Sequence, residues 1–453
     1  MEAEARLVLA GNPSLQDRLT ATAHLCAAAK ACGRPEDAAA AAENFRAALA
    51  REGLSLKAVA TQFDAVPAAV AILTATGDLE GARAFFRMAF LRSGEPLGQI
   101  IMSDTADLAD WAGRSGQPIT IVEPESRITL DPDTHGLSPQ EYTAAPFISA
   151  VVPGGEIMSG CDFVRTPDGT VLGLEAGEFF GVSSKPFFHL HSELTRTVVH
   201  YWPHRAVEVS EAAFFLPAPF RMHRGHWIID GLPRLAALAG RTGFKVAIRS
   251  DLPPRQRELL GLFGVEPAQI IECQYGVRYR FRELLVATYD IGLRPSPGKV
   301  RFLAEALRKP RAPGVRPKRI FVTRGADTRC VANQLEMDAV LAEFGFAAVN
   351  LAETSNADQR EHFSATDVVI ATYGSDVLVS YLMQPGTDLI ELNWSVFLDS
   401  AAGSTCAFLG IDHHVLMCQP VESEARTNKK DFDFVVDCAA LRGLLARITA
   451  AKS

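Results

Sequence analysis

One stretch in the middle of the chain concentrates side chains that can do acid–base chemistry. It reads His223-Arg224-Gly225-His226-Trp227-Ile228-Ile229-Asp230-Gly231-Leu232-Pro233-Arg234-Leu235. His226 and Asp230 stand four residues apart, a spacing that brings side chains together on one face of a helix. The carboxylate can orient the imidazole and stabilise its cation, so either group is a candidate general base. We predict a helix over 226–241, with His223, Trp227 and Arg234 beside a cleft; a solvated polar face with Trp227 in the core fits the same spacing.

A second group of polar residues, later in the chain, has the character of an anion site. Arg324 closes a predicted strand over 319–323, and Arg329 follows it five residues on. A guanidinium group matches phosphate oxygens because its donors form a planar fork. The turn Tyr373-Gly374-Ser375 joins a predicted strand to a helix, whose free N–H groups also favour an anion. The alternative is that Gly374 is only a turn and Arg324 only a surface charge.

The order and separation of these motifs resemble glycosyltransferase family 61. The resemblance is carried by His226-Trp227, Asp230, Leu232-Pro233-Arg234-Leu235, Thr323-Arg324, Arg329, Asn333, Gly345-Phe346 and the segments 368–375 and 385–392. It extends from about Val151 to Leu416. The chain departs from the family pattern at Tyr373-Gly374-Ser375, where His-Gly-Ala is usual, and at Val379, where Asn is usual.

The resemblance implies an enzyme that moves a sugar from a nucleotide-sugar donor to an acceptor hydroxyl. It also implies that Arg329 and Asn333 contact the donor. Glu391, at the end of a predicted strand over 388–392, is placed to accept hydrogen bonds from ribose hydroxyls, although ordinary solvation of a strand end fits as well. Arginines and backbone amides can stabilise a departing diphosphate without a metal, so we expect no metal and no other cofactor. The expected donor-binding residues are Arg324, Arg329, Asn333, Tyr373, Gly374, Ser375 and Glu391.

Two series of alternating strands and helices must position these groups. The first series lies within 211–308, with strands predicted over 212–216, 244–248, 270–272 and 284–287. The second lies within 309–453, after the Pro- and Arg-rich segment 309–317, with strands predicted over 319–323, 347–351, 367–371, 388–392 and 413–418. Such alternation favours parallel sheets with helices on their faces, and ligands then bind beyond the carboxyl ends of the strands. We expect two Rossmann-type halves facing a cleft, the GT-B-like α/β fold that the resemblance implies.

The region over 1–112 is rich in Ala and has helical spacing of its apolar residues, so helices alone are predicted there. Similar Gly- and Asp-containing breaks at 33–38 and 77–82 each precede an amphipathic segment. This pattern suggests helical hairpins of the tetratricopeptide kind. We expect this region to contact a partner protein or to cover the catalytic part; a plain helical extension fits as well.

The segment over 113–210 has short alternating runs broken by turn residues, which predicts a β-rich region. Strands are expected over 119–122, 148–152, 170–174 and 198–201. His189, His191, His200 and His204 lack a Cys or carboxylate partner at metal-site spacing. The triplet Asp131-Pro132-Asp133 has the pattern of a turn, and Asp431-Phe432-Asp433 has that of a strand. Neither is therefore interpreted as a metal-binding motif.

The composition sets limits on the class of protein. The 453 residues carry a net charge of −8, and 48% are hydrophobic. These values favour a soluble protein of two or three domains and argue against general nucleic-acid binding, which leaves a basic footprint. Eight cysteines without a CxxC pair indicate neither a disulfide framework nor a zinc site. Without a signal peptide or a membrane span in the sequence, we expect a cytoplasmic protein, with docking at the inner face of a membrane left open.

The leading hypothesis is an inverting, metal-independent glycosyltransferase that acts on a glycan or another hydroxyl acceptor in surface or exported polysaccharide assembly. A nucleotide-sugar epimerase shares the two-half architecture and is one alternative. A sugar- or nucleotide-binding partner protein that has lost turnover is the other. Tyr373 and Val379 favour this binding protein, whereas His226, Asp230 and Arg329 favour catalysis.

Overall fold

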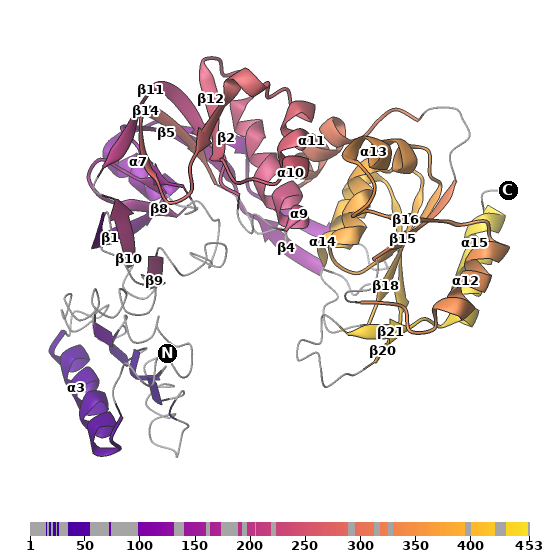
Figure 1. The fold of residues 1–453 in the computed structure, drawn as a ribbon, viewed down its shortest axis with the longest axis horizontal. Helices are drawn as coiled ribbons and strands as arrows, with labels where there is room; N and C mark the ends of the chain where they lie inside the picture. The colour runs from indigo at the N-terminus through magenta and orange to yellow at the C-terminus, as the bar shows by residue number, and fades with distance from the viewer. Residues whose placement is uncertain are drawn as a thin grey trace.

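The computed structural model places the chain in an N-terminal region and two larger α/β units (Figure 1). It describes residues 35–54, 98–130, 140–159, 164–173, 189–192, 197–203, 205–218, 223–288, 295–311, 318–324, 329–394, 400–421 and 432–451, with a few residues between 15 and 73. No described helix is long and apolar enough to cross a membrane.

The N-terminal region contains one described helix of several turns, α3 (Pro35–Arg51). Pro35 occupies its first position and acidic residues its first turn, both of which favour a helix start. Phe45 and Leu49 are buried against residues near Leu19. The second of the two predicted hairpins lies outside the described residues, so the tetratricopeptide-like repeat stays a prediction.

The prediction of helices alone over 1–112 is wrong at its end. Residues Gly98–Asp107 form a strand, β1, which pairs with two later strands, and helix α7 (Leu108–Ser115) follows directly. Trp111 of α7 is buried in the core of the first sheet. The strand-like alternation over Ile100, Met102 and Asp104 is short, so the helical pattern of the Ala-rich sequence around it dominated the prediction. The predicted boundary at 112 therefore falls inside a helix that belongs to the first α/β unit.

The first unit is built on a twelve-stranded sheet. The predicted β-rich segment supplies its earlier strands, β2 (Ile119–Glu123), β5 (Phe147–Pro153), β6 (Glu156–Met158), β7 (Val164–Arg165), β8 (Val171–Gly173), β9 (His189–Ser192) and β10 (Thr197–Pro203). The later strands are β11 (Ala206–Phe215), β12 (Phe244–Arg249), β13 (Ile270–Cys273) and β14 (Arg278–Ala287). These last four run parallel in the order β13-β12-β11-β14, as a Rossmann-type half requires. Helix α10 (Pro254–Leu262) and the short turn η3 (Pro267–Gln269) connect them.

The β-rich segment and the first parallel strands are one structure and not two domains. Strands β5 and β6 pair antiparallel with β14, which joins the two strand sets edge to edge. The predicted boundary at 210/211 also runs through the middle of β11. The sequence did not show this pairing because hydrogen bonds between strands far apart in the chain leave no local signal.

The second unit is a five-stranded parallel sheet in the order β16-β15-β17-β18-β19. Its strands are β15 (Arg319–Thr323), β16 (Ala347–Asn350), β17 (Val368–Thr372), β18 (Asp388–Asn393) and β19 (Asp412–Met417). Its helices are α12 (Gln334–Glu343), α13 (Asn356–Ser364), η4 (Ser375–Leu382), α14 (Ser400–Leu409) and α15 (Cys438–Ala451), and a small ribbon is formed by β20 (Gln419–Val421) and β21 (Asp433–Val435). The five predicted strands are confirmed. Helix α14 was not predicted, and it completes the crossover between the parallel strands β18 and β19.

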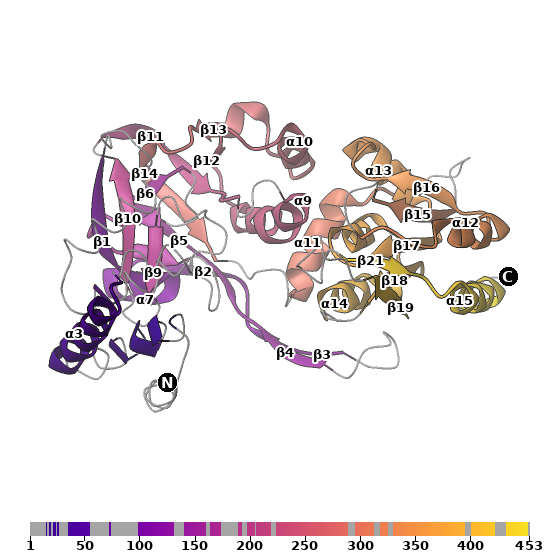
Figure 2. The same cartoon turned by 60° about the horizontal axis from the view of Figure 1, so that its bottom comes forward.

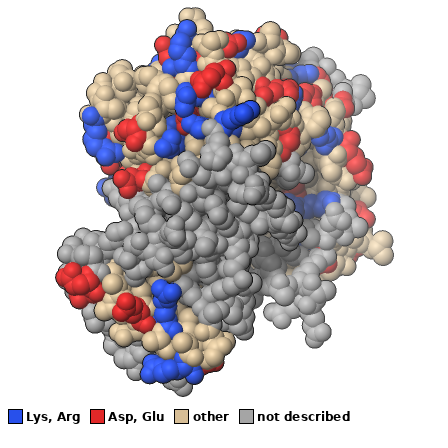
Figure 3. Space-filling view, turned by 60° about the vertical axis from the view of Figure 1, so that its left-hand side comes forward, with Lys and Arg blue, Asp and Glu red and all other residues tan. Residues whose placement is uncertain are grey.

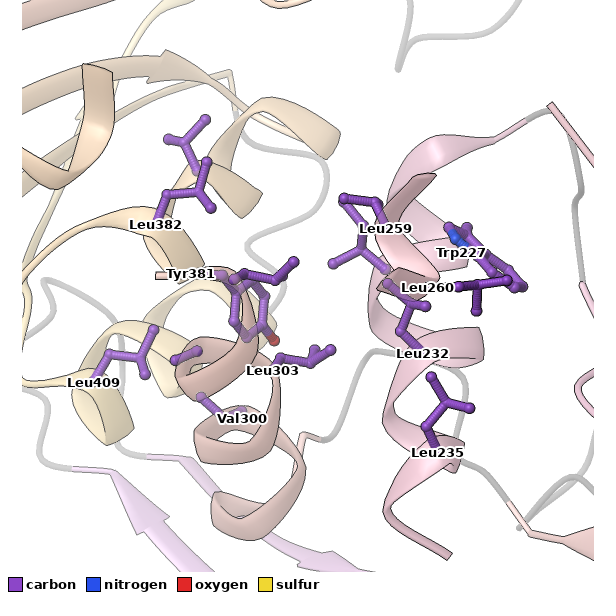
Figure 4. Close-up of a cluster of buried hydrophobic side chains, with 14 of the residues drawn as sticks. Trp227, Leu232, Leu235, Leu259, Leu260, Val300, Leu303, Tyr381, Leu382 and Leu409 are labelled. Atoms are coloured by element: carbon purple, nitrogen blue, oxygen red, sulfur yellow. The ribbon is translucent and has the colours of Figure 1, made fainter. Parts of the chain in front are cut away.

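Helix α11 (Pro297–Leu307) joins the two units. It contacts the helical segment of the first unit as well as η4 and α14 of the second. Figure 4 shows its side chains Val300 and Leu303 between Leu232 of the first unit and Leu409 of the second, within one buried apolar cluster. Burying each such side chain contributes roughly 1.5–3 kcal/mol, so the two units are held together by a shared core.

A hairpin arm provides a second connection between the units. Strands β3 (Ser126–Leu130) and β4 (Gln140–Ala144) leave the first sheet and reach toward the second unit (Figure 2). Ile128 and Leu130 of this arm pack with Phe408 of α14. The Tyr142 hydroxyl donates a hydrogen bond of 2.8 Å to the carbonyl oxygen of Pro295, just before α11.

The described surface carries both signs of charge. Figure 3 shows basic and acidic side chains interspersed over the described part of one face of the first unit. This mixture agrees with the totals of 45 basic and 53 acidic residues in the chain.

Candidate functional site

The helical segment that follows β11 is continuous but irregular. It consists of one α-helical turn, α9 (Arg224–His226), a π-helical turn, η1 (Trp227–Gly231), and a 3-10 helix, η2 (Leu232–Leu238). The helix predicted over 226–241 therefore ends earlier, at Leu238, and it is not a uniform α-helix. Pro233 has no N–H to donate, which interrupts a regular helix here. A Cβ on Gly231 would stand 2.7 Å from the Trp227 ring, which favours glycine at that position. Turns of π-helix often mark functional sites.

His226 and Asp230 meet as their spacing predicted. The distance from His226 Nδ1 to Asp230 Oδ2 is 2.6 Å. The two side chains differ in access, because 29% of the His226 side chain is exposed but only 1% of Asp230. Burial raises the pKa of Tyr381, a tyrosine of the second unit that belongs to the core shared by the two units. Of the two residues, only His226 is positioned to touch a substrate.

The second unit presents two arginines at the carboxyl ends of its strands. Arg324 directly follows β15, and Arg329 Nη1 donates a hydrogen bond of 3.0 Å to the carbonyl oxygen of Tyr373, directly after β17. A Cβ on Gly374 would stand 2.4 Å from Arg329 Nη1 and 3.5 Å from Arg324 Nη2. Gly374 also has φ +104°, so only glycine fits there without strain. Arg329 itself has φ +58°, an unusual backbone conformation of the kind that gathers at functional sites.

Asp376 completes this cluster, and the sequence reasoning missed it. Arg324 Nε donates a hydrogen bond to Asp376 Oδ2. Burial raises the pKa of Asp376, although Arg324 and Arg329 act in the opposite direction. Its position two residues after Gly374, in the first turn of η4, was the available signal. Asp376 fixes the orientation of the Arg324 guanidinium group.

The two groups of residues meet where the two units approach each other. A Cβ on Gly225 would stand 2.9 Å from Ser375 Oγ, so the segments of the two units pack closely here and a side chain at 225 would displace the Ser375 hydroxyl. A cavity of about 220 Å³ opens beside this contact. Its lining comes from both units and includes Arg224, Gly225, Ile228, Arg255, Ser375 and Asp376. This cavity lies between the two units, where the cleft was predicted, but its lining residues do not include His226, Arg324 or Arg329.

Arg224 closes one side of the cavity, and it too was missed as a contact residue. Its Nη2 donates hydrogen bonds to Asn356 Oδ1 at 3.0 Å and to Gln359 Oε1 at 2.7 Å, both on α13. Arg255 of the first unit donates to the carbonyl oxygens of Ala352 and Thr354 in the loop before α13. These contacts fix the first unit to the carboxyl edge of the second sheet.

Two residues predicted beside the cleft lie in the core instead. Trp227 is fully buried, and its Nε1 donates a hydrogen bond of 2.9 Å to the carbonyl oxygen of Gln256. Arg234 is 1% exposed, and its Nη2 donates to the carbonyl oxygen of Ala287 at 2.7 Å. The change from π- to 3-10 winding turns this part of the segment away from the face predicted for it. His223, by contrast, is exposed at the start of α9.

Two predicted donor-binding residues serve the structure of the second unit. Asn333 donates through Nδ2 to the carbonyl oxygen of Val436 and accepts the N–H of Val436 through Oδ1, both at 2.9 Å. Glu391 is buried, and its oxygens accept hydrogen bonds from Asn393 and from His413 Nε2. Every position of β18 is buried, Glu391 included. The donor contacts predicted for Asn333 and Glu391 stay predictions.

Metal ligation has no candidate among the described residues, where no group of three His, Cys, Asp or Glu side chains could hold an ion. Asp433 accepts a hydrogen bond from the N–H of Cys330 at 2.8 Å. Asp131-Pro132-Asp133, His204 and the side chains of His189, His191 and His200 lie outside the described part.

Comparison with known proteins identifies the central part of this structure. Residues 225–390 match the model of the family Glycosyltransferase 61, a narrower span than the motifs suggested. No curated protein matches the chain. The matched span begins at Gly225, beside the histidine–aspartate pair, and continues through both arginines and the Gly374 turn into β18. Through this span the chain carries a domain similar to glycosyltransferase family 61, and this match supports a glycosyltransferase.

Proposed function

We propose that the protein is an inverting transferase of the GT-B type that moves a sugar from a nucleotide-sugar donor to a hydroxyl acceptor. The observation that carries this proposal is the meeting of a partly exposed imidazole and two guanidinium groups across one contact between the units. His226 comes from the first unit, and Arg324 and Arg329 come from the second. An acceptor hydroxyl needs a base on one side, and a departing diphosphate needs positive charge on the other.

His226 is the base in this proposal, and Asp230 positions it. A carboxylate can only accept, so His226 Nδ1 carries a hydrogen toward Asp230 Oδ2 and Nε2 keeps its lone pair. The acceptor hydroxyl gives its proton to this Nε2 as its oxygen attacks the anomeric carbon. Asp230 holds the ring in place and stabilises the imidazolium that forms. Its burial prevents it from taking the proton itself.

Arg324 and Arg329 bind the diphosphate in this proposal, and the peptide N–H groups that follow Gly374 assist them. The charge of Arg324 is offset by Asp376, and the guanidinium group of Arg329 adds positive charge at the same turn. This positive charge partly neutralises a diphosphate. The guanidinium and peptide N–H groups supply the hydrogen bonds to it without a metal. Metal independence is thus part of the proposal, with the guanidinium groups supplying the charge stabilisation.

The wider role follows from the same proposal. We take the acceptor to be a glycan used in surface or exported polysaccharide assembly, made in the cytoplasm or at the inner face of the membrane. The N-terminal region is proposed to contact a partner protein. A binding protein without turnover remains the competing function, because Tyr373 and Val379 depart from the family pattern.

Calorimetry with uridine diphosphate and guanosine diphosphate in the presence of EDTA tests the donor site. The wild type should bind at least one of them, and Arg329→Ala should weaken that binding by roughly 1.5–3 kcal/mol through loss of a charge-assisted contact. Arg442→Ala is the matched control, since Arg442 forms an exposed ion pair with Glu343 on the far helices α15 and α12. Equal affinity in wild type and Arg329→Ala, or a strict need for Mn²⁺, would refute the site assignment.

A further inference from the structure

His223 caps the start of α9 with its own ring. Its Nδ1 accepts a hydrogen bond of 3.4 Å from the N–H of His226. The two imidazole rings lie close together, with 4.7 Å between their centroids and a tilt of 57°. His223 is therefore held at the same surface as the base of the proposed reaction.

The two neighbouring rings carry their hydrogens in opposite positions. A ring nitrogen that accepts a hydrogen bond has no hydrogen, so a neutral His223 carries its hydrogen on Nε2. Although part of the His223 side chain reaches the surface, partial desolvation of its ring lowers its pKa, and the nearby charges of Arg329 and Arg324 lower it further, which favours this neutral form. His226 has the reverse arrangement, since its Nδ1 faces Asp230. His226 thus offers a lone pair at Nε2, and His223 offers an N–H.

The His223 ring lies next to the proposed diphosphate site. A Cβ placed on Gly225 would stand 3.2 Å from His223 Nδ1 and Cε1, and 2.9 Å from Ser375 Oγ. The ring and the turn between β17 and η4 therefore lie on either side of one glycine. The preceding residue of that turn, Gly374, lies against the guanidinium groups of Arg329 and Arg324. The imidazole, the turn and both arginines thus gather around Gly225 and Gly374.

We propose that His223 is a further catalytic residue, whose Nε2–H donates a hydrogen bond to the phosphate that leaves with the nucleoside. This inference rests on the proposed function. The bond between the anomeric carbon and the phosphate oxygen breaks, and its electron pair stays on that oxygen. The acceptor oxygen forms the new bond and loses its proton to His226 Nε2, while His223 keeps its own proton. A neutral donor suits this place because a third full positive charge beside two guanidinium groups would be repelled.

Two substitutions separate this role from capping. In His223→Asn, the side-chain oxygen can still accept the N–H of His226, because Asn is a favourable N-cap residue, but no donor remains at the position of Nε2. In His223→Gln, the longer side chain carries an amide N–H toward the position of Nε2 and gives up the cap. The first variant should keep the wild-type melting temperature, and the second should lower it.

Measurements of activity should rank the two variants in the opposite order, with His223→Asn more affected than His223→Gln. Removing one donor to a developing negative charge costs ~10²–10³-fold in rate, so His223→Asn should slow the release of nucleoside diphosphate from a nucleotide sugar by about that factor. Its affinity for uridine or guanosine diphosphate should fall at least about tenfold, while affinity for the free nucleoside stays unchanged. His223→Gln should retain more of both.

The outcomes are distinct. Wild-type release rates and diphosphate affinity in His223→Asn would overturn the inference and leave His223 as a cap alone. Losses that follow the melting temperature, larger in Gln than in Asn, would also overturn it. Failure of the wild-type protein to bind either diphosphate would refute the proposed function itself, and the inference with it.

Discussion

Two of the histidine–carboxylate pairs among the described residues have nearly equal geometry in opposite surroundings. His226 and Asp230 are 2.6 Å apart at the contact between the units, and His413 and Glu391 are 2.9 Å apart inside the second sheet. The difference is access: 29% of the His226 side chain is exposed but only 1% of His413. The same pair of groups can therefore have two different roles, because an imidazole must reach a substrate before it can exchange a proton with it. The sealed pair can only stabilise the fold.

The largest expected effect is on turnover at the exposed pair. His226→Gln keeps a similar volume and a donor toward Asp230, but the amide cannot take up a proton. We expect kcat to fall by ~10²–10⁴-fold, the usual contribution of acid–base catalysis, with little change in melting temperature. Initial rates of nucleoside diphosphate release, with thermal unfolding as the control, measure both. Near-normal turnover would mean that the two pairs do not differ in function.

Asp230→Asn tests whether the buried partner acts through the ring. An amide nitrogen beside Nδ1 favours the tautomer without the Nε2 lone pair, so kcat should fall ~10²-fold, less than in His226→Gln. The double variant should be no slower than His226→Gln alone, because the carboxylate has no other route to the substrate. Additive losses in this cycle would show an independent role for Asp230.

At the sealed pair, the expected effect is on stability. His413→Gln leaves Glu391 without its imidazole partner in a buried site, which should lower the free energy of unfolding by ~1–3 kcal/mol. Affinity for nucleoside diphosphate should stay at the wild-type level. Urea unfolding and calorimetry provide the two measurements. A variant that unfolds normally but loses diphosphate binding would restore Glu391 to the donor site predicted from the sequence.

The smallest expected effect concerns a third carboxylate, which arginines hold in place of an imidazole. Burial would raise the pKa of Glu156, but hydrogen bonds from Arg278 and Arg280 outweigh it and leave the pKa below its usual range. A lowered pKa in the folded state contributes stability above the unfolded-state value, and this stability is lost as pH falls through the folded-state value. Glu156→Gln should therefore cost roughly 1 kcal/mol at pH 7 and flatten the decline of stability below about pH 5. An unchanged pH profile would show that these arginines do not stabilise the charged carboxylate.

The sequence by itself determined the local order of the molecule and part of its site. Alternating apolar runs and helical spacing are local signals, so strands such as β15, β17 and β18 and the contact of His226 with Asp230 were predicted correctly. The position of Arg324 and Gly374 at the carboxyl ends of parallel strands followed from the same pattern. The motifs also indicated the family, because their order and separation are written along the chain.

Only the tertiary structure decided which of these polar residues face the cleft. Burial depends on what a distant segment places over a side chain, and no local pattern reports it. In the sequence, Asn333 and Glu391 were thus as good candidates for the donor site as Arg329. In the structure, Asn333 forms a hydrogen bond with the backbone of Val436, and Glu391 forms one with the ring of His413. The pairing of Arg324 with Asp376 joins residues 52 positions apart, and the contact between Gly225 and Ser375 joins the two units. Such contacts arise from the packing of the two units on their shared core, which the order of residues alone does not specify.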